Sequence, residues 1–463
     1  MPLLTRPARA RRIFLAIGLA LPLAATAQNP TPAPAPAPDR RVVVRGGTVH
    51  VGDGRTVIEN GAMSFRGSWI EYVGPAAALP PDQTAGAEVI DVTGQHVYPG
   101  LILANSTLGL TEIDAVRASV DEREVGTFNP NVRALIAYNT DSDIPPTVRT
   151  NGVLTVQVTP RGGTISGQSS VVQLDAWNWE DAAVRADDGL HLNWPGHLAR
   201  TGLVPDSIID KRQKAREAAL RDLDQLFADA RTYREALNAS RTNSSRYATN
   251  PPAPAVNLRL AALDAVLSGK QNLYLHADGA KEIVEAVRWA KRIGIGAPVV
   301  VGAAEAAHVL EFLKTNKVAV VLGRVHRLPH RLDDDVDAPF RLPKQLLDAG
   351  IPFCLSYEGD MENPGARNLA FTAGTAAAYG LTPEQALHTV TRGAALILGL
   401  PQLGLLTSNA RPESMEATFV VSRGDLLDMR TNAVTTVFIQ GRRIDLRNKQ
   451  QGLAEKFGAR YRK

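Results

Sequence analysis

Several side chains that can bind ligands or move protons stand at the ends of apolar runs in this sequence. His276 closes the run 273–276, and Asp278 lies two residues further on, where a carboxylate can orient an imidazole. Asn105 and Thr107 follow the run 101–104, and residues two apart share one face of a strand. His276 is therefore a candidate pocket residue, with a hydrogen-bonded core histidine as the alternative.

A glycine-rich segment gives a second candidate. Residues 160–169 follow the apolar run 152–159 and combine glycines and hydroxyls with one basic residue, Arg161. Backbone N–H groups in such a loop can surround an anion or a substrate carboxylate, so Arg161 and Ser166 are candidate pocket residues. The segment has neither the lysine nor the spacing of a phosphate-binding loop, so it does not indicate a nucleotide. A tight structural loop explains it equally well.

The elements that would position these residues alternate between strands and helices. Apolar runs such as 152–159, 298–301 and 318–322 are solid rather than alternating, which is typical of strands buried on both faces. Between such runs, apolar residues recur at spacings of three and four, as in the helix expected at 283–290. Repeated strand–helix units predict a parallel sheet, either open or closed into a barrel.

Both ends of the chain consist instead of short strands and turns. This texture is seen at 42–50 and 62–97 near the start, and at 417–422 and 433–442 near the end. Because chain termini commonly lie close together, we expect one β-sandwich built from both ends. A charged helical insertion is expected at about 206–240, with an apolar stripe that packs on the barrel.

The first 27 residues have the pattern of an export signal. Basic residues precede an apolar run at 13–23, and Ala25-Thr26-Ala27 is a small-residue cleavage site. Arg11-Arg12 also fits a twin-arginine signal, so the export route is Sec or twin-arginine. The run is too short to span a bilayer comfortably, which favours a periplasmic or secreted protein without a stable membrane span over an uncleaved anchor. The Pro/Ala-rich residues 28–40 predict an extended linker.

Composition excludes one broad class of function. The chain has 463 residues, of which 44% are hydrophobic and 21% charged, enough for a large globular core. Its net charge is only +4, and no Lys/Arg-rich run with interleaved aromatics is present, so nucleic acid is not an expected partner. Cys354 is the single cysteine and lies in an apolar run, which predicts a buried, unreactive thiol.

Several segments, taken in order, resemble the amidohydrolase superfamily, and most closely its imidazolonepropionase-like branch. Residues 98–102 are similar to the family's first barrel strand, 275–278 to its His-Ala strand, and 368–400 to the helices after its last strand. The resemblance extends from residue 42 to about 445. It implies an α/β fold, a (β/α)8 TIM-like barrel with a composite β-sandwich formed by N- and C-terminal segments. It also implies a divalent metal that activates water at the barrel's strand ends.

The chain departs from this family where the metal is bound. Members carry two histidines on the first barrel strand, and Asn105 and Thr107 occupy those places here. Neither residue is a good zinc ligand, so both are expected to line the substrate pocket. His276 matches a metal-binding histidine of the family. Glu112, in the loop after the first strand, is either a further ligand or a surface acid. If the site holds a divalent metal, zinc is the expected ion, and His276 and Glu112 are its candidate ligands.

The family's last barrel strand ends in a carboxylate that serves as ligand and proton shuttle. The corresponding segment here is 355–360, in which either Glu358 or Asp360 takes this catalytic role. The alternative is that both are solvated loop acids. Tyr357 lies beside them and is a further candidate pocket residue.

Two functions follow from the sequence. The first is an exported hydrolase that cleaves carbon–nitrogen bonds of a small amide or cyclic amide at a reduced or rewired metal site. The second is a catalytically inactive binding protein or the partner subunit of an active paralogue, and the chain either forms homo-oligomers or pairs with that paralogue. The expected segments are a signal peptide (1–27), a linker (28–40), a first sandwich part (41–97), the barrel (98–405), a second sandwich part (406–446) and a tail (447–463).

Overall fold

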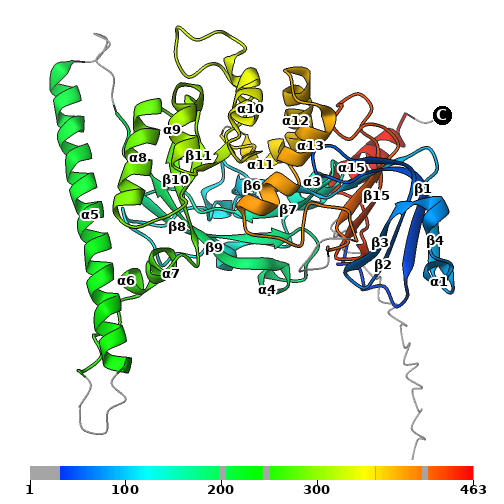
Figure 1. Cartoon of the computed structure of the whole chain (residues 1–463), viewed down its shortest axis with the longest axis horizontal. Helices are drawn as coiled ribbons and strands as arrows, with labels where there is room; N and C mark the ends of the chain where they lie inside the picture. Colours follow the sequence, from blue (N-terminus) through cyan, green and yellow to red (C-terminus); the bar gives the residue numbers. More distant parts are fainter. Residues whose placement is uncertain (1–31, 198–204, 243–250, 360, 409–414, 462–463) are drawn as a thin grey trace, which may run out of the picture.

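A computed structural model describes residues 32–197, 205–242, 251–359, 361–408 and 415–461 (Figure 1). One of its two eight-stranded sheets has strands that pair in chain order, and a parallel bridge between Ala104 and Ser356 joins its last strand to its first. The sheet therefore closes into a barrel. Its strands are β6 (Leu101–Ser106), β7 (Val153–Val158), β8 (Ile165–Gln173), β9 (Ala183–Asn193), β10 (Asn272–Ala277), β11 (Val299–Gly302), β12 (Ala319–Leu322) and β13 (Phe353–Leu355).

One barrel strand runs against the other seven. β8 pairs antiparallel with both β7 and β9, whereas the other neighbouring pairs are parallel. The loop between β7 and β8 is too short for the helical crossover that parallel strands require. The predicted α/β barrel is confirmed, with a hairpin in place of one strand–helix unit.

Helices cover the outside of the second half of the barrel (Figure 1). The helix α8 buries Ile283, Val287 and Ala290, the apolar stripe that the spacing predicted. The long helix α5 stands at the edge of the barrel and buries Leu223 and Phe227. The main helices are α3 (Ile144–Arg149), α5 (Asp206–Thr242), α8 (Ala280–Arg292), α9 (Leu310–Thr315), α10 (Ala338–Ala349), α12 (Leu369–Ala378), α13 (Pro383–Thr389) and α14 (Arg392–Ile397).

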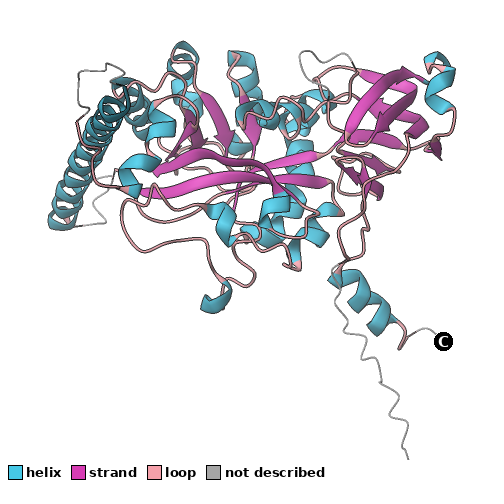
Figure 2. Ribbon diagram, turned by 90° about the horizontal axis from the view of Figure 1, so that it is seen from below, coloured by secondary structure: helices cyan, strands magenta, loops and turns pink. Residues whose placement is uncertain are grey.

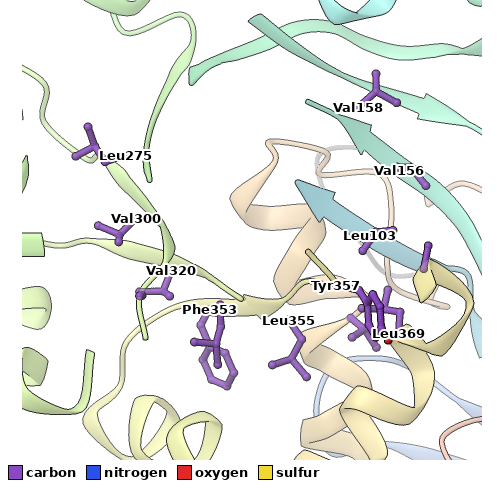
Figure 3. Packing of buried hydrophobic residues seen from close by; sticks show 14 of the residues in the cluster. Leu103, Val156, Val158, Leu275, Val300, Val320, Phe353, Leu355, Tyr357 and Leu369 are labelled. Atoms are coloured by element: carbon purple, nitrogen blue, oxygen red, sulfur yellow. The ribbon is translucent and has the colours of Figure 1, made fainter. Parts of the chain in front are cut away.

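Alternate residues of the barrel strands belong to two separate cores. Side chains such as Leu103, Leu275 and Val320 pack in the layer between strands and helices (Figure 3). Their neighbours, among them Ile102 and Tyr274, form the inner core together with residues of α14. Because side chains two apart on a strand share a face, His276 continues the inner row begun by Tyr274 and faces the barrel interior.

The second unit is built from both ends of the chain. The strand β5 lies between β1 and β14, and Phe419 of β14 pairs with Pro99 of β5. Phe65, Phe419 and Phe438 form its aromatic core. The composite β-unit is confirmed, as one mixed sheet of β1 (Val42–His50), β2 (Val57–Arg66), β3 (Trp69–Pro75), β4 (Glu88–Asp91), β5 (His96–Pro99), β14 (Phe419–Ser422), β15 (Val434–Ile439) and β16 (Arg442–Arg443).

A buried carboxylate ties the two units together. Asp175, 5% exposed, accepts hydrogen bonds from Arg149 at 2.5 Å and from Arg442 at 2.8 Å. It also accepts the backbone N–H of Ala35 at 2.9 Å, so this part of the Pro/Ala linker lies on the folded body. The helix α15 (Lys449–Gly458) projects from that body near the C-terminus and has no buried residue (Figure 2). None of the described helices is long and apolar enough to cross a membrane.

Candidate active site at the barrel mouth

Seven parallel strands end on one side of the barrel, which we call the barrel mouth. Asn105 lies there, fully buried at the end of β6, in a left-handed conformation with φ of 55°. Asparagine tolerates this conformation better than most residues. The register between β6 and β7 breaks beside Asn105, and its N–H donates to Gln157 Oε1 at 2.9 Å. The strand alternation expected for Asn105 and Thr107 is therefore interrupted.

The side chain of Asn105 connects a cation to a carboxylate. Arg161 Nη1 donates to Asn105 Oδ1 at 2.7 Å, and Arg161 Nη2 donates to the backbone oxygen of Asn105 at 3.1 Å. Asn105 Nδ2 in turn donates to Glu358 Oε2. On its other side, Arg161 Nη2 donates to Glu362 Oε1 at 2.9 Å, on the short helix α11 (Glu362–Gly365). One network thus joins the end of β6, the loop between β7 and β8, and the segment that follows β13.

Glu358 is a carboxyl group suited to proton transfer. It lies half-buried just beyond β13, with its Oε1 close to the backbone of Gly323. Burial raises the pKa of Glu358 to about 7; Arg161 opposes this rise, and the negative charges of Asp278 and Glu362 add to it. A group with a pKa near neutrality is populated both as acid and as base at neutral pH.

Two histidines face each other beside this network. His276 Nε2 and His191 Nδ1 are 2.8 Å apart, so one ring donates to the other according to its tautomer. Burial lowers the pKa of His276 to about 3, and the charge of Arg161 lowers it further. Burial, His276 and Arg161 lower the pKa of His191 well below its usual value. Both rings are therefore neutral at physiological pH.

A buried carboxyl group supports these residues from inside the barrel. Asp188 is fully buried and accepts hydrogen bonds from Gln157 at 2.8 Å, Tyr274 at 2.8 Å and Ser169 at 2.7 Å. Burial raises its pKa, and the three hydrogen bonds oppose that rise. Gln157 also holds the backbone of Asn105, and the ring of Tyr274 stacks on His191 at 4.5 Å. Asp188 thus fixes the positions of both Asn105 and His191.

A cavity of about 570 Å³ opens beside Arg161 at the barrel mouth. Its lining includes Thr107, Arg123, Arg161 and Glu362. A larger cavity of about 710 Å³ lies where the barrel strands begin, next to Asn272 and Phe353. We place the candidate site at the mouth because the convergent polar groups are there, and because catalytic residues of such barrels come from the ends of strands.

Solved structures with the same architecture identify the fold. An amidohydrolase from Thermotoga maritima superposes with a TM-score of 0.73 at 23% sequence identity, covering 87% of this chain and 99% of that one. The chain has the amidohydrolase fold. Ochratoxinase from A. niger (TM-score 0.52, 15% identity, 89% and 98% covered) and molinate hydrolase (0.51, 15%, 88% and 95%) are similar as well. No protein-family model and no curated protein matches the sequence.

The amidohydrolase fold is typically associated with a bound metal, but the donor set here does not fit one. Within the described ranges, no three His, Cys, Asp or Glu side chains come together as a ligand set. His276 Nε2 faces His191, and Asn105 Oδ1 already accepts from Arg161. Glu112 instead bonds the hydroxyl of Ser142 and accepts the N–H of Asp143 at 3.1 Å. A tetrahedral zinc site needs several nitrogen, sulfur or carboxylate ligands converging on one point.

The other candidate residues from the sequence lie at or near the mouth. The backbone N–H of Thr107 donates to Glu362 at 2.7 Å, and Ser166 is buried and accepts from Asn193 at 2.9 Å. The guanidinium of Arg324 stacks over the ring of Tyr357 at 5.2 Å. Asp360 lies outside the described residues, so Glu358 is the acid whose surroundings are known.

Sequence reasoning missed Glu362 of the network and three residues that support it, Gln157, Asp188 and His191. Each of the last three is a polar side chain within or beside an apolar strand-like run, as in 189–193, Gly-Leu-His-Leu-Asn. Buried polar groups require partners, so a polar residue in such a run was a usable signal. The sequence did not show which residue is the partner of each polar side chain, because the partners lie on different strands.

Proposed function

We propose that this chain is a hydrolase of carbon–nitrogen bonds in a small amide or cyclic amide, with Glu358 as the proton-transfer residue. The observation that carries the proposal is the position of Glu358: a half-buried carboxyl with a pKa of about 7, at the end of a barrel strand and joined through Asn105 to Arg161. The names of two structures with this fold, ochratoxinase and molinate hydrolase, agree with small-molecule hydrolysis.

The residues can carry out amide hydrolysis in two proton transfers. Glu358 in its ionised form removes a proton from water, and the oxygen of that water bonds to the amide carbon. The guanidinium of Arg161 stabilises the negative charge that develops on the carbonyl oxygen. Glu358 then returns the proton to the nitrogen as the carbon–nitrogen bond breaks, giving a carboxylic acid and an amine. The neutral His276 and His191 contact each other beside this network and need no charge for these steps.

A binding protein without catalysis, or the partner subunit of an active paralogue, is the second candidate. One observation favours it. Glu362 and Asn105 already accept hydrogen bonds from the Arg161 guanidinium, so part of its positive charge is neutralised within the protein and is not directed at a substrate.

The two candidates are separated by activity measurements on the chain from Gln28 onward. N-acyl amino acids, anilides and hydantoin-type cyclic amides would be screened for acid release, and kcat and KM measured for the best substrate. We expect Glu358→Gln to lower kcat at least 100-fold with little change in KM, and kcat/KM of the wild type to rise with an apparent pKa near 7. Glu311→Gln, on the exposed face of α9, is the matched control. Ligand binding without turnover across the screen would favour the binding protein.

We also propose that the chain is exported and then cleaved after Ala27. The support is the sequence pattern of residues 1–27, which lie outside the described ranges. N-terminal sequencing of protein recovered from the periplasm of a bacterial host should begin at Gln28. Recovery of an intact leader in the cytoplasm would contradict this proposal.

A further inference from the structure

Arg161 is a cation fixed by protein contacts that use only some of its hydrogen-bond donors. A guanidinium carries five N–H donors. The structure assigns one to Asn105 Oδ1, one to the backbone oxygen of Asn105 and one to Glu362. Within the part of the chain that the structure describes, Nε–H and the second hydrogen of Nη1 have no protein acceptor.

These two donors belong to a residue that lines the 570 Å³ cavity and is 21% exposed. A second arginine of the cavity wall, Arg123, is paired with its neighbour Glu122 at 2.5 Å. Glu362 is the acid that competes for Arg161, since its carboxylate contacts Nη2 at 2.9 and 3.2 Å. Arg161 is the less exposed of the two and is fixed by Asn105 as well as by Glu362, so it can present its remaining donors to a ligand from a set position. Glu362 sets how much of its charge is available.

The contact between Arg161 and Asn105 places a positive charge where the related fold binds a metal. Asn105 occupies the place of a metal-binding histidine in the resemblance described above, and its side-chain oxygen accepts a hydrogen bond from Arg161. A fixed guanidinium repels a divalent cation at short range, particularly where solvent screening is reduced. Asn105 thus offers no imidazole to a metal, and its side-chain oxygen holds the positively charged guanidinium of Arg161 at the site.

We propose that Arg161 replaces the metal as the permanent cation of the barrel mouth and forms a metal-independent subsite for an oxyanion of the ligand. The ligand group is a carboxylate, or the tetrahedral oxyanion that forms when water adds to an amide. The planar fork of an arginine matches such paired oxygens. This inference deepens the proposed function, because it names the group that the same site recognises.

The test measures binding, and so it needs no turnover. The mature chain is treated with EDTA, and methylphosphonate is titrated against it while the ³¹P linewidth is followed; acetate and its neutral isostere acetamide are compared by competition. We expect methylphosphonate to bind equally well with EDTA and with added zinc, and acetate but not acetamide to displace it. Elemental analysis after dialysis against zinc should find less than 0.1 equivalent of metal.

Three variants make the test specific. Arg161→Met should weaken methylphosphonate binding at least tenfold, Glu362→Gln should tighten it severalfold by removing the competing carboxylate, and Arg292→Met, an exposed arginine on α8, should leave it unchanged. If Arg161→Met does not fold, judged by circular dichroism, Glu362→Gln decides: unchanged or weaker binding would overturn the proposal. Binding that requires zinc, stoichiometric bound zinc, or an adventitious interaction unaffected by Arg161→Met would overturn it too. A chain that binds the phosphonate but hydrolyses no amide would refute the hydrolase proposal and leave this subsite standing.

Discussion

The raised pKa of Glu358 has a measurable consequence for stability. Its pKa is about 7 in the folded chain, against a usual value of 4.5. Between these values the folded chain keeps a proton that the unfolded chain has lost, so the free energy of unfolding falls as pH rises from about 4.5 to 7. Each pKa unit corresponds to about 1.4 kcal/mol in the free energy of unfolding. Because solvent reaches part of this half-buried group, we take at most about 3 kcal/mol for the whole shift.

The perturbation is Glu358→Gln, which keeps an oxygen to accept from Asn105 Nδ2 but carries no titrating proton. The variant should gain stability relative to the wild type as pH rises, by up to about 3 kcal/mol between pH 4.5 and pH 8, and the gap should stop widening above pH 8. Urea unfolding followed by tryptophan fluorescence at four pH values measures this gap. Glu311→Gln gives the background. A gap that stays constant with pH would refute the raised pKa and with it the proton-transfer role of Glu358.

Three further predictions concern stability and reactivity. Arg149→Met should lose about 3 kcal/mol in urea unfolding, because it removes one partner of the buried Asp175, and a loss below 1 kcal/mol would contradict a buried pair. Gly189→Ala places a Cβ 2.2 Å from the buried ring of Tyr274 and should lower the melting temperature by several degrees. The control Gly296→Ala, whose Cβ meets nothing within 4 Å, should leave it unchanged. Equal melting temperatures for the two variants would contradict the packing. Cys354 is buried, and burial raises its pKa to about 12, so a thiol reagent should modify it only after unfolding, and rapid labelling of the native chain would contradict this.

The sequence predicted the fold better than the site, for a physical reason. Solid apolar runs such as 318–322 became β12 because burial on both faces leaves a strong local pattern. The antiparallel β8 was not predicted, since its direction depends on the loop before it and on its pairing with two neighbours. Strand alternation also failed at Asn105, whose φ of 55° turns its side chain out of the pleat.

Residues of the candidate site were found one by one, but their contacts were not. Arg161, Asn105 and Glu358 were each expected at the mouth, yet Asn105 and Glu358 are separated by 253 positions in the chain. The pairing of Arg161 with Glu362 spans 201 positions. Local periodicity in a sequence cannot show which residues so far apart in the chain come into contact, because closure of the barrel brings them together.

The shared β-unit makes the order of synthesis matter for this chain. The strand β5 ends at Pro99, and its neighbour β14 begins at Phe419, so one edge of β5 stays unpaired until more than 300 further residues have been made. Unpaired strand edges are sites of intermolecular association. The last part of the chain therefore covers an edge of the first, and a nascent or truncated chain lacking β14 leaves that edge of β5 open to association with other chains.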